Sequence, residues 1–325
     1  MSAPAVLAAS QASLQKHART FAWAAALLGR QLQQDVAITY AFCRYLDDLA
    51  DESPDPAQAE TALNSVRRDL QRRESAAPLV AAMLALVQRR QIDLRALLAL
   101  VDGVQSDLGE VQVRSQAEFD RYCYQVAGAV GVLMCGLFGV RDTRALPYAI
   151  DLGLAMQRTN ICRDVAEDAT MGRTYLPAVQ LLKAGVAPGD LLVARQTPRG
   201  VLPVIEQVLH DADVLYHSAR QGYRFLPLQP RLAVAVAGQL YSMIGDRLRR
   251  QGGDPWRGRA MVPAWQKVLG TLWAVGVALL APLWRGAHNP SLHQHLQGFA
   301  GADASAATAG QVAARSPADA HTALR

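Results

Sequence analysis

The sequence is short of the residues that mark disulfide or di-iron chemistry. Its 325 residues include only four cysteines, Cys43, Cys123, Cys135 and Cys162, and no two of them form a CxxC pair. Each lies in an apolar or helical stretch, so we expect buried free thiols, which fits a reducing cytoplasm. Seven histidines are present, and none stands in the Glu-x-x-His arrangement of di-iron bundles.

Motifs for nucleotide binding and hydrolysis are also missing. We find no Walker loop, no GxGxxG and no GxSxG. The net charge of +5 is not accompanied by interleaved aromatic and basic residues, which disfavours nucleic acid as a partner. Most of the positive charge comes from arginine, whose guanidinium group suits anions such as phosphates.

The sequence shows neither a signal-peptide pattern nor an apolar run of full membrane-spanning length. Met1 to Ser13 has no charged start followed by an apolar core, so we expect no signal peptide. The apolar run that stands out, Val268 to Trp284, has 17 residues and contains Pro282. A spanning helix needs about 20 residues. We interpret this run as a buried or interfacial helix.

Aromatic residues make up only 6% of the chain, and no segment alternates as a strand would. Alanine and leucine dominate the apolar residues, which favours helices. We therefore predict an all-α domain over residues 1–285, followed by a disordered, alanine-rich tail over residues 286–325. The predicted helices cover about residues 14–28, 34–52, 57–73, 76–89, 94–108, 118–138, 147–168, 202–223, 231–251 and 263–280.

A first acidic cluster stands on a predicted helix that is otherwise apolar. Asp47 and Asp51 are four residues apart and share one helix face with Arg44, while Asp48 lies beside them. A solvated acidic face near a helix end is the ordinary alternative. However, the remaining positions are mostly apolar, so the helix should be buried, and buried carboxylates are costly without a compensating positive charge. A hard divalent cation is the natural partner of such oxygen ligands.

A second polar stripe lies on the predicted helix over residues 147–168, and its members follow steps of three, four and four. One such stripe could be a hydrogen-bonded seam between helices. Two acidic stripes with arginines indicate instead two walls that face each other across a cavity. Because Mg²⁺ keeps coordination positions open for phosphate oxygens, the pattern predicts a metal–diphosphate site. The stripe consists of Gln157, Asn160, Asp164 and Asp168, with Arg163 and Arg173 near its end.

These segments resemble the signatures of the squalene/phytoene synthases, which are head-to-head prenyl synthases. Tyr40 to Glu52 resembles the first aspartate-rich signature, and Gln157 to Pro177, ending in GRTYLP, resembles the second. Tyr122 to Gly131, YCYQVAGAVG, is similar to the helix between them. The resemblance runs from about His17 to Lys267. It implies a single isoprenoid-synthase-type helical bundle with a central cavity.

The resemblance implies a prenyltransferase that joins two prenyl diphosphates 1′-1 through a cyclopropylcarbinyl diphosphate. Mg²⁺, or Mn²⁺ in its place, would stabilise the departing diphosphate. We expect two geranylgeranyl diphosphates to give phytoene, in carotenoid biosynthesis. The alternative is that two farnesyl diphosphates give squalene, presqualene diphosphate or dehydrosqualene, and NADPH would be needed only for squalene. A non-catalytic helical assembly factor would not need both carboxylate pairs with their arginines.

The resemblance also implies roles for individual side chains. The expected catalytic residues are Asp47, Asp51, Asp164, Asp168 and Tyr122, and the expected metal ligands are Asp47, Asp48, Asp51, Asn160, Asp164 and Asp168. The expected diphosphate ligands are Arg44, Arg163, Arg173, Tyr241 and Arg259, together with His17, Arg19 and Thr20, where similar proteins more often carry Ser and Lys. The expected contacts with the rest of the substrate are Phe21, Tyr40, Ala127, Gly131 and Gln157.

Two stretches between the acidic clusters raise further questions. The small residues from Val126 to Gly131 either leave room for a prenyl tail or allow close helix packing. Ten residues before Tyr122, many similar proteins carry Arg-Tyr, whereas this chain has Gln112-Val113. That departure puts a local packing or substrate contact in doubt, and it does not affect the metal site.

The apolar run over residues 268–284 also bears on localisation. Together with a basic stretch, it could hold the protein against anionic lipid, so we expect peripheral contact with the inner face of the membrane. The alternative is that this helix closes the core and that Arg259 serves the site. The basic stretch consists of Arg247, Arg249, Arg250, Arg257 and Arg259.

Overall fold

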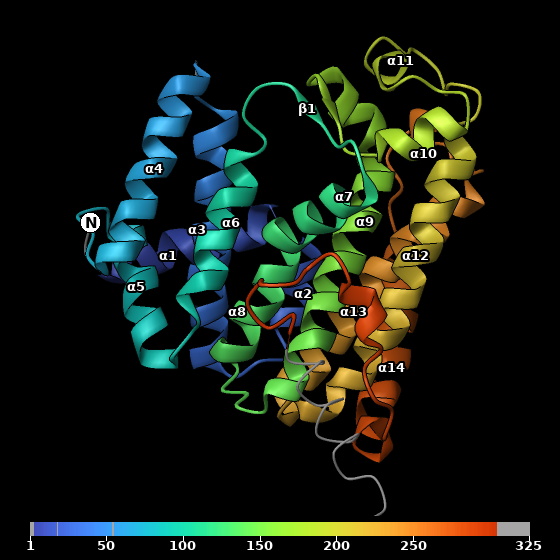
Figure 1. Cartoon of the computed structure of the whole chain (residues 1–325). Helices are drawn as coiled ribbons and strands as arrows, with labels where there is room; N and C mark the ends of the chain where they lie inside the picture. The colour runs from blue at the N-terminus through green and yellow to red at the C-terminus, as the bar shows by residue number, and fades with distance from the viewer. Residues whose placement is uncertain (1–2, 18, 54, 304–325) are drawn as a thin grey trace, which may run out of the picture.

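The computed structural model is built almost entirely of helices, as the composition predicts (Figure 1). It describes residues 3–17, 19–53 and 55–303. Within these ranges the only strands are β1 (Val111–Gln112) and β2 (Arg173–Thr174), which pair in parallel. The blue N-terminal helices and the yellow-to-orange C-terminal helices lie on either side of the green α8 and α9 (Figure 1).

The long helices follow the predicted ranges closely, because strong local signals mark their ends. Asp55 caps α4 by accepting a hydrogen bond from the Ala57 amide, with Pro56 in the first turn, and Asp93 caps α6 in the same way. These helices are α3 (Arg30–Asp51), α4 (Pro56–Arg72), α5 (Pro78–Arg90), α6 (Leu94–Gln105), α9 (Leu146–Thr170), α12 (Val201–Gly222), α13 (Leu228–Arg250) and α14 (Ala264–Leu280).

Other elements differ from the predicted ranges. The helix predicted over residues 14–28 is replaced by α1 (Ala3–His17) and α2 (Arg19–Ala25). The helix predicted over residues 118–138 consists of α7 (Gln116–Cys123), one π-helical turn, η1 (Tyr124–Gly128), and α8 (Ala129–Leu137). Short helices have little local signal, so they were not predicted. They are α10 (Ala178–Lys183), α11 (Pro188–Leu192), η2 (Thr143–Ala145), η3 (Tyr223–Phe225), η4 (Pro255–Arg257), η5 (Ala281–Leu283) and η6 (Pro290–His293).

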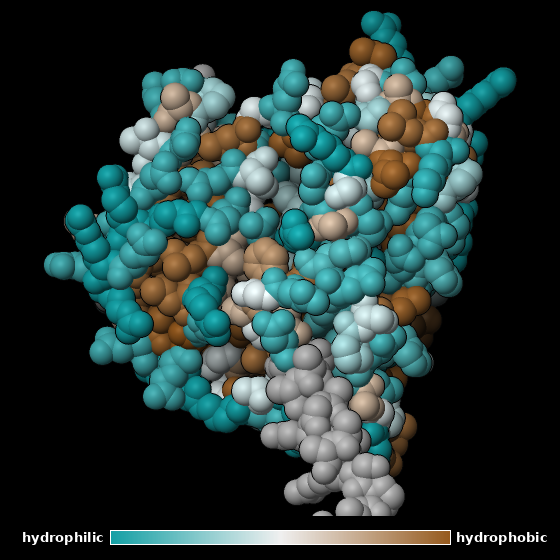
Figure 2. All heavy atoms as spheres, viewed as in Figure 1, coloured by the Kyte–Doolittle hydropathy of each residue, from teal (hydrophilic) through white to brown (hydrophobic). Residues whose placement is uncertain are grey.

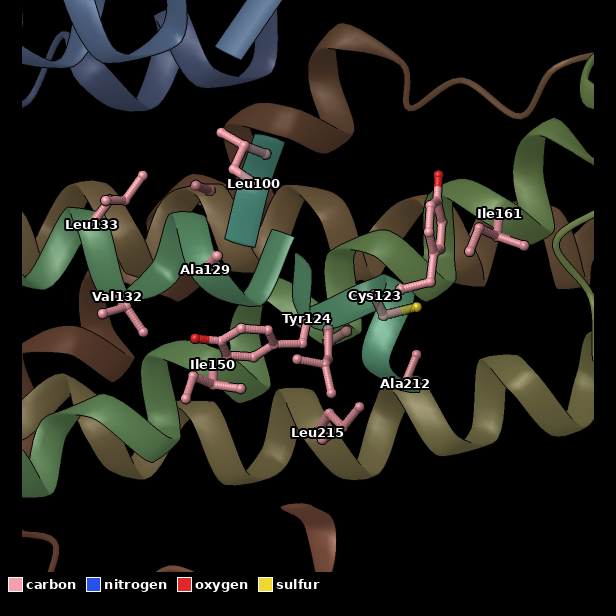
Figure 3. Close-up of a cluster of buried hydrophobic side chains, with 14 of the residues drawn as sticks. Leu100, Cys123, Tyr124, Ala129, Val132, Leu133, Ile150, Ile161, Ala212 and Leu215 are labelled. Atoms are coloured by element: carbon pink, nitrogen blue, oxygen red, sulfur yellow. The ribbon is translucent and has the colours of Figure 1, made fainter. Parts of the chain in front are cut away.

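Helix α9 is at the centre of the packing, in contact with α8, η1, α12 and α13. Figure 3 shows Tyr124 of η1, Ile150 of α9 and Leu215 of α12 within one buried cluster. Close approach to α8 and η1 depends on glycine: a Cβ on Gly131 would lie 2.2 Å from the Ala149 carbonyl oxygen, and one on Gly153 would lie 2.3 Å from that of Ala127. The small residues after Val126 therefore allow close helix packing.

The predicted central cavity is present, with a volume of about 400 Å³. Residues from α2, α3, η1, α8, α9 and α13 line it, and most are apolar. Val126, Ala127, Val130 and Gly131 are among them, so the run of small residues both packs against α9 and leaves space for a ligand.

Helix α14 packs on α13 with only one narrow face, formed by Gly270, Ala274 and Ala278. Its opposite side exposes large apolar side chains, and hydrophobic atoms lie along this edge of the molecule (Figure 2). Ala264–Leu283 is long and apolar enough to cross a membrane by length and composition, which alone is weak evidence. The exposed side chains, here called the apolar face of α14, are Trp265, Val268, Leu269, Leu272, Trp273, Leu279 and Leu280.

Two arginines of the predicted basic stretch form ion pairs with acidic residues of other helices. Arg249 forms ion pairs with Glu206 and Asp213 of α12. Arg259 forms an ion pair with Asp164 of α9. Arg259 therefore lies beside the second acidic cluster, and contact of the basic stretch with lipid stays a prediction.

The prediction of a disordered tail from residue 286 needs correction. Residues 286–303, here called the C-terminal strap, cross the outer side of α8 and α9 as the red end of the ribbon (Figure 1). Leu296 is fully buried, and a Cβ on Gly301 would touch Leu146 and Val132. The composition predicted disorder wrongly, because a few specific contacts order this segment although it has little apolar surface. Residues 304–325 lie outside the described part of the structure.

The strap is held at Asp151, a fully buried carboxylate on α9. His288 and His293 donate to its two oxygens at 2.9 and 2.8 Å, and Ser218 of α12 donates at 2.5 Å. Burial by itself raises the pKa of Asp151, but hydrogen bonds from both histidines outweigh it and leave the pKa below its ordinary value. The carboxylate therefore stabilises the folded chain at neutral pH.

We expect Asp151→Asn to destabilise the protein by about 3 kcal/mol at neutral pH, because an amide group would face the N–H of a buried histidine. A carboxyl whose folded pKa is depressed contributes stability above its unfolded pKa of about 3.9 and loses it as pH falls through the folded value. The difference between variant and wild type in urea unfolding should therefore shrink as the pH falls below the unfolded pKa of about 3.9. A difference that is constant with pH would contradict this account.

Candidate active site

The two acidic segments meet at one end of the cavity. Asp47 of α3 and Gln157 and Asn160 of α9 all line it. Arg173 of β2 reaches across to α3, where its Nη2 lies 2.8 Å from Oδ1 of Asp51. Residues between 110 and 122 positions apart in the sequence thus form one polar wall next to an apolar cavity.

A short backbone arrangement places Arg173 there. Gly172, with φ +73°, ends the turn after α9 in a conformation that favours glycine. The chain then pairs with β1, where the Val113 amide donates to the Thr174 carbonyl at 3.2 Å. The Ala178 amide donates to the Val113 carbonyl at 2.8 Å. The backbone of Gln112 and Val113 therefore holds the second signature in place through hydrogen bonds in which the two side chains take no part.

Negative charge is concentrated at the first cluster. Asp47 faces the cavity and is exposed there, yet protein surrounds it on its other sides, and this burial raises the pKa of Asp47 to about 7. This value also includes the effect of Arg44, which lowers the pKa, and of the charges of Asp51 and Asp107, which raise it. Arg44 also forms an ion pair with Asp48 at 2.6 Å, so Asp48 is already neutralised.

The second cluster has the same character. Burial raises the pKa of Asp168 to about 7, with further contributions from the charges of Asp164 and Glu167. Arg163 donates from Nε to Asp164 at 2.8 Å. Arg259 lies 3.3 Å from the same carboxylate and 3.1 Å from that of Glu167. Asp164 is thus bound by two arginines, while Asp168 is not compensated to the same degree.

Asp107, just beyond the end of α6, is a functional candidate that sequence reasoning missed. Its carboxylate accepts hydrogen bonds from Tyr175 at 2.8 Å and Tyr122 at 3.2 Å. Burial raises the pKa of Asp107 to about 6, and its charge raises the pKa values of both Asp47 and Asp168. Asp107 therefore lies between the two clusters. It is a single acid without an acidic neighbour four residues away, so no spacing pattern marked it.

The donor set fits a hard divalent cation. Among the described residues, Oδ1 of Asn160 is a buried oxygen without a hydrogen-bond partner. The nearby donors are carboxylate oxygens whose pKa values are raised by burial first and by neighbouring negative charge second. Oxygen-only ligands with uncompensated charge are what Mg²⁺ binds in proteins.

The remaining predicted residues divide into three groups. Tyr122 stacks on Tyr175 at 4.8 Å between ring centroids, beside Asp107. Thr20 is half-buried and is not among the described residues that line the cavity, and the side chains of His17 and Arg19 lie outside the described part of the structure. The predicted substrate contacts that do line the cavity are Phe21, Tyr40, Ala127, Gly131, Gln157 and Tyr241.

Comparison with known proteins gives a consistent picture. A family model described as squalene/phytoene synthase matches residues 14–266. Phytoene synthase of Pseudescherichia vulneris is 31% identical over 303 residues, which cover 90% of this chain and 98% of that protein. Phytoene synthase of Thermus thermophilus is 36% identical over 257 residues, or 79% of this chain and 88% of that protein.

Solved structures agree with the sequence comparison. A dehydrosqualene synthase superposes with a TM-score of 0.76 and 27% identity, covering 84% of this chain and 96% of that chain. A squalene synthase from Alicyclobacillus acidocaldarius has the same fold, with a TM-score of 0.69, 24% identity and coverage of 77% and 95%. The chain belongs to the squalene/phytoene synthase family and is a prenyltransferase.

Proposed function

We propose that the protein condenses two geranylgeranyl diphosphates head to head to phytoene. The observation that carries this proposal is the identity of 31–36% to phytoene synthases, which extends over most of both chains. The facing acidic clusters beside an apolar cavity agree with substrates that have a diphosphate head and a hydrocarbon tail. Carotenoid biosynthesis is the pathway that uses this product.

The reaction forms a cyclopropylcarbinyl diphosphate and then rearranges it, releasing two diphosphates and two protons in total. The apolar cavity would hold both tails and keep water from the carbocations. Arg163, Arg173 and Arg259 already contact the carboxylates of the site, so they stand where a diphosphate oxygen could accept their N–H groups. Asp107 would hold Tyr122 in a fixed orientation beside the reacting carbons.

Condensation of two farnesyl diphosphates to a C30 product is the second candidate. One observation favours it, namely the superposition on a dehydrosqualene synthase with a TM-score of 0.76. The two candidates use the same chemistry and differ in tail length. They can therefore be separated only by the product.

We expect the purified protein, with Mg²⁺ and equal amounts of the C15 and C20 diphosphates, to form phytoene without NADPH. The hydrocarbons would be identified by mass spectrometry, with and without NADPH. A C30 product as the main species would overturn the C20 assignment, and its dependence on NADPH would separate squalene from dehydrosqualene. No product under any condition would favour a non-catalytic assembly factor.

We further propose that Asp47, Asp51, Asn160, Asp164 and Asp168 hold Mg²⁺, with Mn²⁺ as a substitute. When bound, the cation would stabilise the diphosphate as it leaves. The support is the unpartnered oxygen of Asn160 and the raised pKa values of Asp47 and Asp168. Asp48, which is paired with Arg44, is the least suited of the predicted ligands.

Asp47→Asn should lower turnover by a factor of about 100 or more, because a metal ligand is lost. The metal-free variant should unfold at the same temperature as the wild type or higher, because one charge is removed from a repulsive cluster. Addition of Mg²⁺ with inorganic diphosphate should raise the melting temperature of the wild type more than that of the variant. Glu74→Gln, an exposed acid on another surface, is the control. Near-normal turnover of Asp47→Asn would contradict the assignment.

The apolar face of α14 supports a further proposal, that the protein docks peripherally on the inner face of the membrane. Trp265 and Leu272 are 63% and 66% exposed, and Trp23 of α2 extends the surface through a 3.2 Å hydrogen bond to Thr271. Tryptophan is enriched where protein meets the interfacial layer of a bilayer. A hydrocarbon product also needs an apolar acceptor.

The docking proposal predicts that the protein floats with phosphatidylcholine–phosphatidylglycerol vesicles in a density gradient. The double variant Leu269→Glu/Leu272→Glu should lose this binding, because charged groups would enter the apolar layer. Val193→Glu, which changes an exposed apolar residue elsewhere, should bind as the wild type does. Wild-type protein that stays at the bottom of the gradient would overturn the proposal.

A further inference from the structure

The C-terminal strap lies outside residues 14–266, which the family model matches. It carries three of the seven histidines of the chain, His288, His293 and His295. All three bond to buried carboxylates on the helices beneath. Such regular pairing indicates a specific attachment of the strap.

Asp151 and its two histidines have the geometry of hydrogen bonds. Each oxygen of the carboxylate accepts from a different Nε2, at 2.9 and 2.8 Å. The histidine side chains are 5% and 3% exposed, and their Nδ1 atoms are buried without a partner. A metal ligand normally donates its second ring nitrogen to a fixed acceptor. Because that acceptor is missing, the cluster fits a hydrogen-bonded latch better than a cation site.

A second attachment joins the strap to α7 and α9 together. His295 contacts one oxygen of Asp120 on α7 at 2.7 Å. Arg158 of α9 forms an ion pair with the other oxygen at 2.6 Å. Because Arg158 adjoins Gln157 in the predicted active site, this buried network ties the strap to the helix that bears the second acidic cluster.

A third attachment reaches the π-helical turn. The Tyr124 hydroxyl donates to the Ala300 carbonyl at 2.7 Å, and its ring lies 4.5 Å from that of Phe299. Val126 and Ala127, two and three residues further along η1, line the cavity. The outer side of this turn therefore bears the strap, while its inner side faces the substrate.

The same relation holds at the opposite end of the strap. The Tyr148 hydroxyl donates to the Gly286 carbonyl at 3.0 Å, and Tyr148 itself lines the cavity. Ala149 and Leu152, on either side of the Asp151 latch, line it too. The attachment points of the strap on η1 and α9 therefore lie on helical segments whose other residues line the cavity proposed to hold the prenyl tails.

We propose that the C-terminal strap clamps η1 and α9 from outside through His288, His293 and Tyr124, and thereby sets the fit of the cavity to prenyl-tail length. These three are positioning residues, since none of them touches the cavity directly. A clamped wall keeps the cavity at one size, so a tail that fills it gains contacts that a shorter tail lacks, whereas a released wall can close around tails of both lengths. This inference rests on the proposed prenyl diphosphate chemistry.

The test is the ratio of kcat/KM for C20 to that for C15 diphosphate, measured with the full-length enzyme. This ratio does not depend on how much of the enzyme is folded, so a role in stability alone would leave it unchanged. In His288→Ala/His293→Ala we expect the selectivity to move toward unity by about threefold or more. His288→Gln/His293→Gln, whose amides can still donate to Asp151, should restore it in part.

Tyr124→Phe is the milder variant, since it loses only the hydrogen bond to Ala300. If His288→Ala/His293→Ala does not fold, the selectivity of Tyr124→Phe tests the inference in its place. His217→Ala, at an exposed histidine on α12, is the control and should keep wild-type selectivity. If the variants are active and their ratio of kcat/KM for the C20 and C15 diphosphates is unchanged, this inference is wrong and the proposed function stands. A wild-type enzyme that converts neither diphosphate would overturn the proposed function and this inference together.

Discussion

Electrostatic repulsion among carboxylates is the constraint on which the rest of this structure depends. Burial raises the pKa values of Asp47 on α3, Asp168 on α9 and Asp107 just after α6, and the charge of Asp107 contributes to the raised values of the other two. Charges held this close in a partly buried site would separate if the helices were free to move. The fold must therefore supply enough packing to hold them together before any substrate arrives.

That packing comes mainly from α9. The helix bears the second acidic cluster at one end and is surrounded by α8, η1, α12 and α13 along its length. Backbone contact at Gly131 and Gly153 brings η1 and α8 close to it, and the same glycines leave room for the cavity. One set of small residues therefore serves both stability and substrate space.

Arginines complete the arrangement by neutralising part of the charge in the free protein. Arg173 bridges from β2 to Asp51, while Arg163 and Arg259 bind Asp164. In the proposed function these same guanidinium groups would donate to the oxygens of an incoming diphosphate. The ion pairs of the free protein would then be replaced on both sides, because the diphosphate would pair the arginines and the proposed cation would pair the carboxylates.

The sequence alone determined the all-α class, most of the long helices and both acidic clusters, because helix caps and spacings of three and four residues are local properties. It did not reveal Asp107 or the β1–β2 pair, since each depends on partners distant in the chain, and it did not reveal the π-helical turn. The strap was misjudged for the same reason: its composition is poor in apolar residues, and only the tertiary structure brings His288 and His293 to Asp151. Local sequence patterns thus identified the acidic clusters of the site. Long-range packing decided how the helices that surround the cavity are held in place.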